Sequence, residues 1–299
     1  MADGGSAPLS YRIRHRTLYS YSAPVSISHH LLHLDPRSTD HQTVTRLGLE
    51  ISPKVERTSR DLDAFGNTIR SLTIDAAHKA LELTMQARVR LHPPVIPLPA
   101  ATPAFETVAA ETADPNDVSM MEAAPFAYPS PMVPTDDRFQ DYARASFGPG
   151  RPVLEGVLEL SRRLHEDLVY DPGATEVTTL PAEAFARRRG VCQDYAHIAL
   201  ACLRSIGLPA RYVSGYLRTR RDDEEALVGA DASHAWISVW VPGAGWIDVD
   251  PTNDVVPAGE HITLAWGRDY TDVSPVAGVV FGGGNHHLDV EVSVTSDDG

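Results

Sequence analysis

The stretch Arg189-Gly190-Val191-Cys192-Gln193-Asp194-Tyr195-Ala196-His197 organises the rest of the chain, because it places a thiol at the start of an apolar helix. The apolar run from Ile198 to Ile206 follows it, and Gly207-Leu208-Pro209 predicts the end of that helix. Gly190 indicates a tight entry, so Cys192 falls in the first helical turn. Free backbone N–H groups and the positive end of the helix dipole favour a thiolate there.

A thiolate needs a base and an orienting group to carry out amide chemistry. Two later segments offer them: Ser233-His234-Ala235-Trp236, and the stretch from Gly245 to Thr252, which contains Asp250. His234 lies 42 residues after Cys192, and Asp250 lies 16 residues after His234, so neither spacing fits a contact within one helix or strand. Two antiparallel strands with the helix docked over them would bring the three side chains together.

The blocks Gly-Val-Cys-Gln-Asp-Tyr-Ala-His, His-Ala-Trp and Asp-Pro-Thr-Asn, in this order, resemble the bacterial transglutaminase-like superfamily. The resemblance spans residues 150–255 and implies a papain-like fold, in which a cysteine helix packs on an antiparallel sheet. It also implies that Cys192 is the nucleophile, His234 the base and Asp250 the orienting carboxylate.

Each of these residues also has a structural interpretation. A cysteine at the start of an apolar helix is often a small core residue, and an aspartate before proline is commonly a turn residue. A lone histidine is usually structural. The three together, in the order of the family, favour the catalytic interpretation, whereas Cys202 on the same helix is expected to be a core residue.

Further residues are candidates for supporting roles. The backbone N–H of Cys192 is expected to be one oxyanion donor. Animal transglutaminases supply a second donor from a tryptophan upstream of the nucleophile, whereas every tryptophan here lies downstream of Cys192. The candidates for an oxyanion or supporting role are Tyr170, Gln193, Asp194 and Trp236. The segment from Glu260 to Tyr270 suits a substrate cleft wall, with Trp266, Arg268 and Tyr270 as candidates, or a structural cap.

The chain divides into three parts. Residues 10–92 alternate with a period of two between turn residues, which predicts a small β-sandwich. This part resembles the N-terminal domain of bacterial transglutaminase-like proteins in Leu34-Asp35-Pro36-Arg37 and Asp63-Ala64-Phe65-Gly66-Asn67. Residues 93–134 hold ten of the 23 prolines, which predicts a linker or a wrap over the domain, with a docking peptide as the alternative.

Residues 135–299 are expected to form the catalytic domain, with its core at about 150–255 and a C-terminal extension at 256–299. Helical patterns come first in this part, and strand patterns follow from Arg211 onward. That order, after an all-β domain, predicts an α+β fold class.

Two segments superficially suggest a metal site. His29 and His33 would share a helix face, but His30 stands where a zinc motif of that spacing needs a glutamate. The stretch from Asp248 to Asp254 fails the calcium-loop pattern, because Thr252 and Asn253 replace required residues. No metal and no other cofactor is therefore expected.

The composition of the chain indicates which classes of partner and which cellular compartment to expect. The net charge of −14 argues against nucleic acid or an anionic membrane as a partner. The start, Met1 to Ser6, shows no secretory signal, and no apolar run approaches the roughly 20 residues that span a bilayer. The two cysteines, ten residues apart on one helix, would be roughly 15 Å apart and could not form a disulfide. A cytoplasmic location is expected.

The sequence thus predicts an enzyme that cleaves amide or isopeptide bonds of a peptide or protein through a thioester acyl-enzyme. Water as the acceptor makes it a protease or amidase, and an amine makes it a transglutaminase. The lack of an upstream tryptophan favours hydrolysis. The alternative from another class is an inactive binding module of the same fold. The substrate, the acceptor and the oligomeric state stay open at this point.

Overall fold

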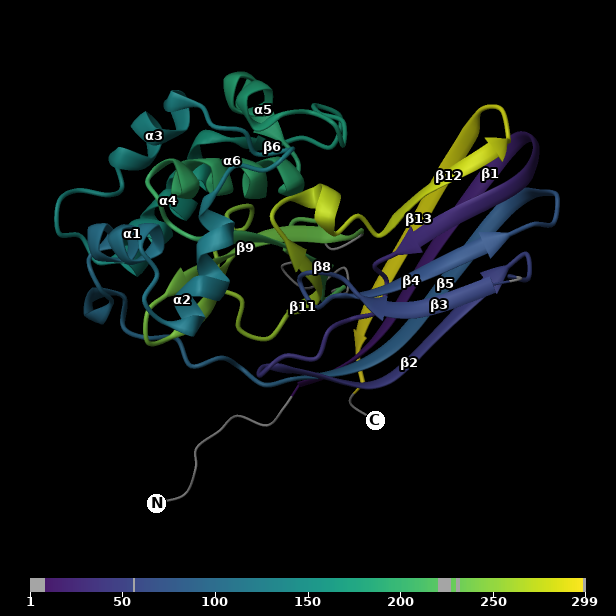
Figure 1. Ribbon diagram of the computed structural model, residues 1–299, viewed down its shortest axis with the longest axis horizontal. Coiled ribbons are helices and arrows are strands. Elements are labelled where there is room, and N and C mark those ends of the chain that lie inside the picture. Colours follow the sequence, from purple (N-terminus) through teal and green to yellow (C-terminus); the bar gives the residue numbers. More distant parts are fainter. Residues whose placement is uncertain (1–8, 56, 220–226, 230–231, 298–299) are drawn as a thin grey trace, which may run out of the picture.

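The structure, a computed structural model, describes residues 9–55, 57–219, 227–229 and 232–297. A bent antiparallel sheet forms one side of the molecule, and a layer of helices on a second sheet forms the other (Figure 1). The predicted α+β class is therefore confirmed. No helix in the described ranges is long and apolar enough to cross a membrane.

The first sheet is built around its longest strand, β1, which carries hydrogen-bonded neighbours on both sides. Within the described residues its order is β2-β5-β1-β4-β3, and β12 and β13 also pair with β1. Its strands are β1 (Leu9–Leu32), β2 (Gln42–Ser52), β3 (Arg57–Leu62), β4 (Thr68–Ile74), β5 (His78–Leu91), β12 (Val276–Gly282) and β13 (His286–Ser296).

Strand β1 changes partners half-way along its length. Its first half pairs with β5 and β13, and its second half pairs with β4 and β12. The register with β5 shifts between Ser20 and Val25, where Pro24 lacks the N–H that a regular ladder needs. The strands expected for residues 10–92 therefore belong to one hydrogen-bonded sheet, bent along β1, and not to two separate sheets.

The C-terminal segment differs from its sequence-based assignment. The sequence predicts that residues 256–299 extend the catalytic domain. Residues 261–267 do pair with the second sheet, but β12 and β13 return to the N-terminal sheet and pair with β1 (Figure 1). The hydrogen-bonding edge of β1 accounts for this, because an unpaired strand edge accepts another strand. Strand alternation alone gives no information about which sheet a strand joins.

The proline-rich part is a wrap with helices of its own. It contains η1 (Pro99–Ala101), α1 (Phe105–Ala113), α2 (Val118–Ala123) and η2 (Ala124–Ala127). Val108 and Val133 are buried in the same core as the helix that carries Cys192. Residues 93–134 are thus packed against the catalytic part, because apolar side chains between the prolines provide a surface to bury.

The helices and the second sheet make up the remainder. The second sheet has the order β10-β9-β8-β11 within the described ranges, and α6 packs on β8 and β9. Nearly every residue of α6 is buried, as its apolar pattern predicts. The elements are α3 (Asp137–Arg144), α4 (Val153–Asp167), β6 (Val169–Tyr170), α5 (Pro181–Arg187), β7 (Arg189–Gly190), α6 (Cys192–Ser205), β8 (Ala210–Leu217), β9 (His234–Val241), β10 (Gly245–Val249), β11 (His261–Gly267) and η3 (Tyr270–Asp272).

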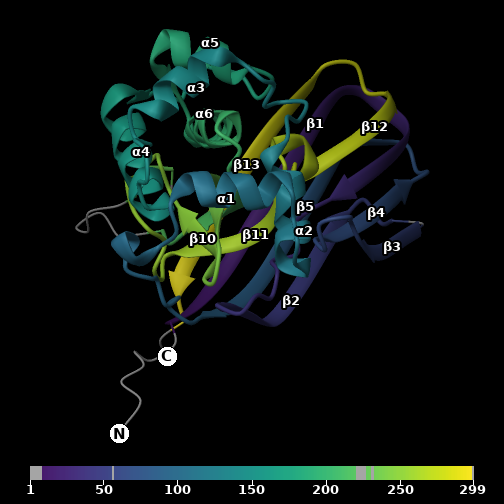
Figure 2. The same ribbon diagram turned by 60° about the vertical axis from the view of Figure 1, so that its left-hand side comes forward.

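The two sheets share a second hydrophobic core. Tyr216, Ile262 and Leu264 of the second sheet are buried together with apolar residues of β1, β4 and β5. The Tyr216 hydroxyl lies 2.7 Å from Nδ1 of His15 on β1. Turned by 60°, the view shows the second sheet between the helices and the N-terminal sheet (Figure 2). This packing fixes one face of the second sheet against α6 and the other against the N-terminal part.

Candidate active site

Cys192 is the first residue of α6, and the turn that leads into it leaves no room for a larger residue at position 190. A Cβ on Gly190 would lie 2.4 Å from Oδ2 of Asp194. That oxygen accepts hydrogen bonds from the Val191 N–H at 2.8 Å and from the Thr175 hydroxyl at 2.6 Å. Asp194 therefore caps the helix start, and burial raises the pKa of its carboxyl above the ordinary value.

His234 and Asp250 are brought together by two neighbouring strands. His234 begins β9, and Asp250 directly follows β10, which pairs antiparallel with β9. Nε2 of His234 lies 2.9 Å from Oδ2 of Asp250, and both side chains are buried. Nε2 thus donates to the carboxylate, which leaves Nδ1 as the ring nitrogen that can act on another group.

Within the part of the chain that the structure describes, five donors hold the Asp250 carboxylate. Oδ1 accepts from the backbone N–H groups of Thr252 and Asn253, and Oδ2 also accepts from the Asn253 side-chain amide at 2.8 Å. Nε2 of His261 lies 3.0 Å from the same Oδ2. Sequence reasoning missed His261 in this role, since no local motif relates β11 to the end of β10. Its placement depends on β11 lying beside β8.

Charge keeps the pair ionised in spite of its burial. Burial alone would lower the pKa of His234, but the charges of Asp250 and Cys192 and the hydrogen bond to Asp250 raise that pKa well above its ordinary value. Burial would raise the pKa of Asp250, but the charge of His234 and hydrogen bonds from both histidines hold that pKa far below its usual range. The directions of both shifts favour an imidazolium and a carboxylate at neutral pH.

The second ring nitrogen of His234, Nδ1, is buried beside Gly229 and has Cys192 nearby. Nδ1 makes no hydrogen bond of ordinary geometry with any described residue, yet Cys192 is close enough to raise the pKa of the ring. A Cβ on Gly229 would lie 2.7 Å from Nδ1 and 3.7 Å from the Tyr170 hydroxyl. Gly229 has a φ of +92°, so glycine is favoured there, and a side chain at this position would collide with the imidazole edge.

The other candidate residues for a supporting role differ in whether they lie beside the His234 ring. The Gln193 amide donates to the Val177 carbonyl at 2.8 Å, so it is committed to a loop. Trp236 stacks on His234 with ring centroids 6.2 Å apart, and its Nε1 donates to Asp248. Tyr170 lies beside Gly229 and the imidazole edge. Trp236 and Tyr170 thus border the His234 ring.

The three residues proposed for a cleft wall do not form one wall. Arg268 donates to Asp272, and the backbone N–H of Tyr270 donates to Nε2 of His197. Trp266 lines a cavity on the face of the second sheet that points away from α6. Of the two interpretations of this segment, a structural cap describes Arg268 and Tyr270.

A metal could in principle use His234, Asp250 and His261, whose potential ligand atoms all lie within 4.8 Å of one another. Both Nε2 atoms, however, already point at one oxygen of Asp250 at hydrogen-bond distances. A hydrogen-bonded network satisfies these groups without an ion. The expectation that the site uses no metal stays a prediction.

Comparison with known proteins gives matches over both parts of the chain. Residues 11–90 match the model of the bacterial transglutaminase-like N-terminal region, and residues 140–251 match that of the transglutaminase-like superfamily. An uncharacterized protein of Mycobacterium tuberculosis is 36% identical over 98% of this chain and 96% of its own length. A protein-glutamine gamma-glutamyltransferase of Pseudomonas aeruginosa is 34% identical over 126 residues, which are 40% of this chain and 19% of that protein.

One solved structure is similar over nearly the whole fold. It is described as "a Putative Cysteine Protease from Cytophaga hutchinsonii" and superposes with a TM-score of 0.76 at 22% sequence identity. The match covers 98% of this chain and 92% of that one. At this level of identity, the likeness concerns the arrangement of both sheets and the helices.

Proposed function

The chain belongs to the transglutaminase-like superfamily, and on this basis we propose that it is a cysteine-dependent enzyme that cleaves amide or isopeptide bonds of peptides or proteins. The observation that supports the proposal most is the buried His234–Asp250 ion pair, with Cys192 close to the histidine at the first turn of α6. A thiol, a base and an orienting carboxylate are the groups that thioester chemistry needs.

In the proposed mechanism, the Cys192 thiolate attacks the substrate carbonyl and forms a tetrahedral oxyanion. The backbone N–H of Cys192, at the first position of α6, precedes the hydrogen-bonded N–H groups of the helix, and we expect it to stabilise this charge. Collapse of the intermediate breaks the C–N bond, and His234 gives the leaving amine or ammonia a proton. Asp250 holds the imidazole orientation and stabilises its charged form.

An acceptor then resolves the thioester on Cys192. We propose water as this acceptor, since all four tryptophans follow Cys192 in the sequence and the upstream tryptophan of animal transglutaminases is lacking. Transfer to an amine is the second candidate, and the sequence match to the Pseudomonas gamma-glutamyltransferase favours it. Both reactions would use the same three residues. The two free, buried cysteines fit a reducing compartment, and we expect a cytoplasmic location.

Product analysis separates the two acceptors. The wild-type chain is incubated with glutamine-containing and isopeptide-linked peptides, with and without a primary amine, and the products are read by mass spectrometry. Hydrolysis predicts the free acid as the main product even when amine is present. An amine adduct as the main product would instead assign acyl transfer. The lack of any conversion that requires Cys192 would count against both.

A further inference from the structure

A cavity of ≈ 790 Å³ lies on the side of the second sheet that faces away from α6. The two faces of the second sheet differ, as strand alternation predicts: Ala210, Tyr212 and Val249 are in the core around α6, whereas Arg211, Trp246 and Asp248 line the cavity. The segment 39–42, which leads into β2, closes the cavity from the N-terminal part. The cavity is therefore separate from the Cys192 side of the sheet.

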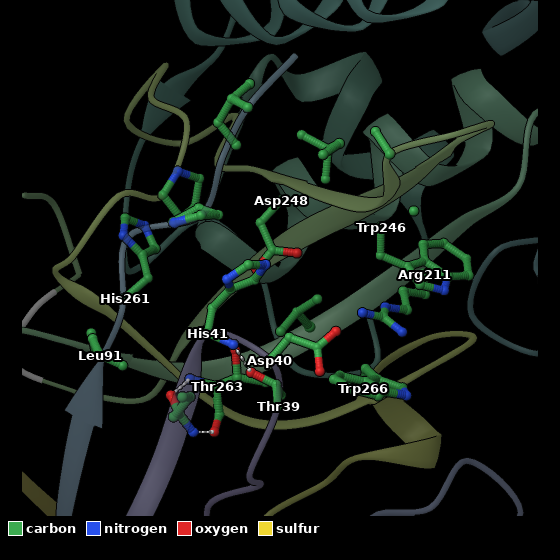
Figure 3. Close-up of a pocket in the computed structure, with 18 of the residues that line it drawn as sticks. Thr39, Asp40, His41, Leu91, Arg211, Trp246, Asp248, His261, Thr263 and Trp266 are labelled. Carbon is green, nitrogen blue, oxygen red and sulfur yellow. Dashed lines mark hydrogen bonds between the residues drawn. The ribbon is translucent and has the colours of Figure 1, made fainter. Parts of the chain in front are cut away.

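Arg211 is the most unusual group in this cavity. Its guanidinium lies between two indole rings, 4.3 Å from the centroid of Trp246 and 3.7 Å from that of Trp266 (Figure 3). The residue is only 8% exposed. Among the described residues it has no hydrogen-bond or ion-pair partner, and its Nε is buried without an acceptor.

This arrangement leaves the buried Nε–H of Arg211 without an acceptor among the described residues. Stacking on aromatic rings attracts a cation but accepts none of the five N–H donors of a guanidinium. Burial lowers the pKa of Arg211 to about 9, with Asp248 opposing and Arg37 adding to the shift, so the group stays cationic at neutral pH. Arg37, which stacks on Trp266 at 3.4 Å, also has a buried Nε without an acceptor, but its Nη1 donates to the Phe65 carbonyl and to Asn67.

We propose that this cavity is a binding site for a small organic carboxylate, the class that includes the C-terminus of a peptide, with the carboxylate held by Arg211. A planar carboxylate accepts two parallel hydrogen bonds from a guanidinium. Trp246, Trp266 and Phe126 offer apolar walls to the remainder of the ligand, and Phe126 packs edge-on against Trp246 at 5.3 Å.

The other charges in the cavity disfavour a dianion more strongly than a monoanion. Asp40, Glu122 and Asp248 line the same space, and Asp248 is close enough for its charge to act on Arg211. Three carboxylates repel a dianionic phosphate more strongly than a singly charged carboxylate. His261, which also lines the cavity, donates to Asp250, so an occupant would lie one residue away from the buried His234–Asp250 pair.

The test uses two probes that differ only in their charge. N-acetylphenylalanine and its amide are titrated by calorimetry into the full chain carrying Cys192→Ala, so that cleavage of the amide cannot contribute. We expect the acid to bind and the amide to bind at least about tenfold more weakly, as for the loss of a charged hydrogen bond. Arg211→Met should remove acid binding, and Arg211→Lys, which keeps the charge without the fork, should weaken it. Inorganic phosphate is the comparison anion.

Each outcome has a definite meaning. Equal binding of acid and amide, or unchanged acid binding in folded Arg211→Met, would overturn the proposal, and so would phosphate binding as tightly as the acid. Lack of binding by the N-acetyl acids of phenylalanine, leucine and glycine at millimolar concentration would overturn it too. The acid–amide comparison needs no change at Arg211, so it stands even if Arg211→Met does not fold. Because these titrations do not depend on catalysis, their result is independent of the proposed enzymatic function.

Discussion

Replacing Cys192 with alanine is expected to lower the rate of amide-bond cleavage by about 10⁴-fold or more, because the acyl-enzyme can no longer form. The change removes one sulfur from a residue that is 9% exposed, so the fold should be retained. Product formation from the peptides described above is measured by mass spectrometry for the wild-type chain and the variant at equal concentration.

Cys202→Ala provides the matched control for this loss. Cys202 lies on the same helix and is fully buried, and burial raises the pKa of its thiol. It has no place in the proposed chemistry, so the control should keep wild-type turnover once its folding has been checked by circular dichroism. Wild-type turnover in Cys192→Ala would contradict the proposed cysteine-dependent function, whereas a lack of turnover in the wild-type chain itself would favour an inactive module of the same fold that binds a partner.

Asp250→Asn is expected to lower the free energy of unfolding by about 3–5 kcal/mol near neutral pH, because it leaves the buried His234 imidazolium without its counter-charge. The substitution keeps the shape of the side chain, so packing is little changed. Urea denaturation, followed by tryptophan fluorescence, measures the loss. Asp248→Asn is the control, since Asp248 is partly exposed and accepts from Trp236, and it should cost about 1 kcal/mol.

The loss of folding stability in Asp250→Asn should be larger at low pH than at high pH. The raised pKa of His234 stabilises the folded state fully below the ordinary histidine pKa of about 6.5, and this contribution is lost as pH rises through the raised value. The lowered pKa of Asp250 stabilises the fold above about pH 4 and is lost as pH falls through its folded pKa. The difference between wild type and Asp250→Asn should therefore be larger at about pH 5.5 than at about pH 9. An equal difference at both values would show that charge is not its cause.

Local sequence patterns were sufficient to predict the helix and the strands that carry Cys192, His234 and Asp250. The apolar run after Cys192 defines α6, and the short alternating segments around Trp236 and Trp246 define β9 and β10. The resemblance to a known family added the expectation that the helix start, the head of β9 and the end of β10 meet. The hydrogen bond between His234 and Asp250 agrees with that expectation.

Such local patterns could not predict contacts between segments that lie far apart in the sequence. His261 reaches Asp250 only because β11 pairs with β8, and Trp266 faces the cavity after a register shift between Thr263 and Ala265. A shift of one residue moves a side chain to the other face of a sheet, and sequence alternation cannot locate it. The return of β13 to β1 likewise depends on which strand edge is open.

The most direct test of an activated Cys192 is its rate of alkylation by iodoacetamide as a function of pH, read by peptide mass spectrometry with Cys202 as the internal reference. The account predicts rapid labelling of Cys192 at about pH 6, where a free thiol with a pKa of about 8.5 is almost fully protonated, and much slower labelling in His234→Ala. Cys202 should stay unlabelled in the folded chain. Labelling of Cys192 that rises only near the pKa of a free thiol, and that is unaffected by His234→Ala, would contradict the central claim.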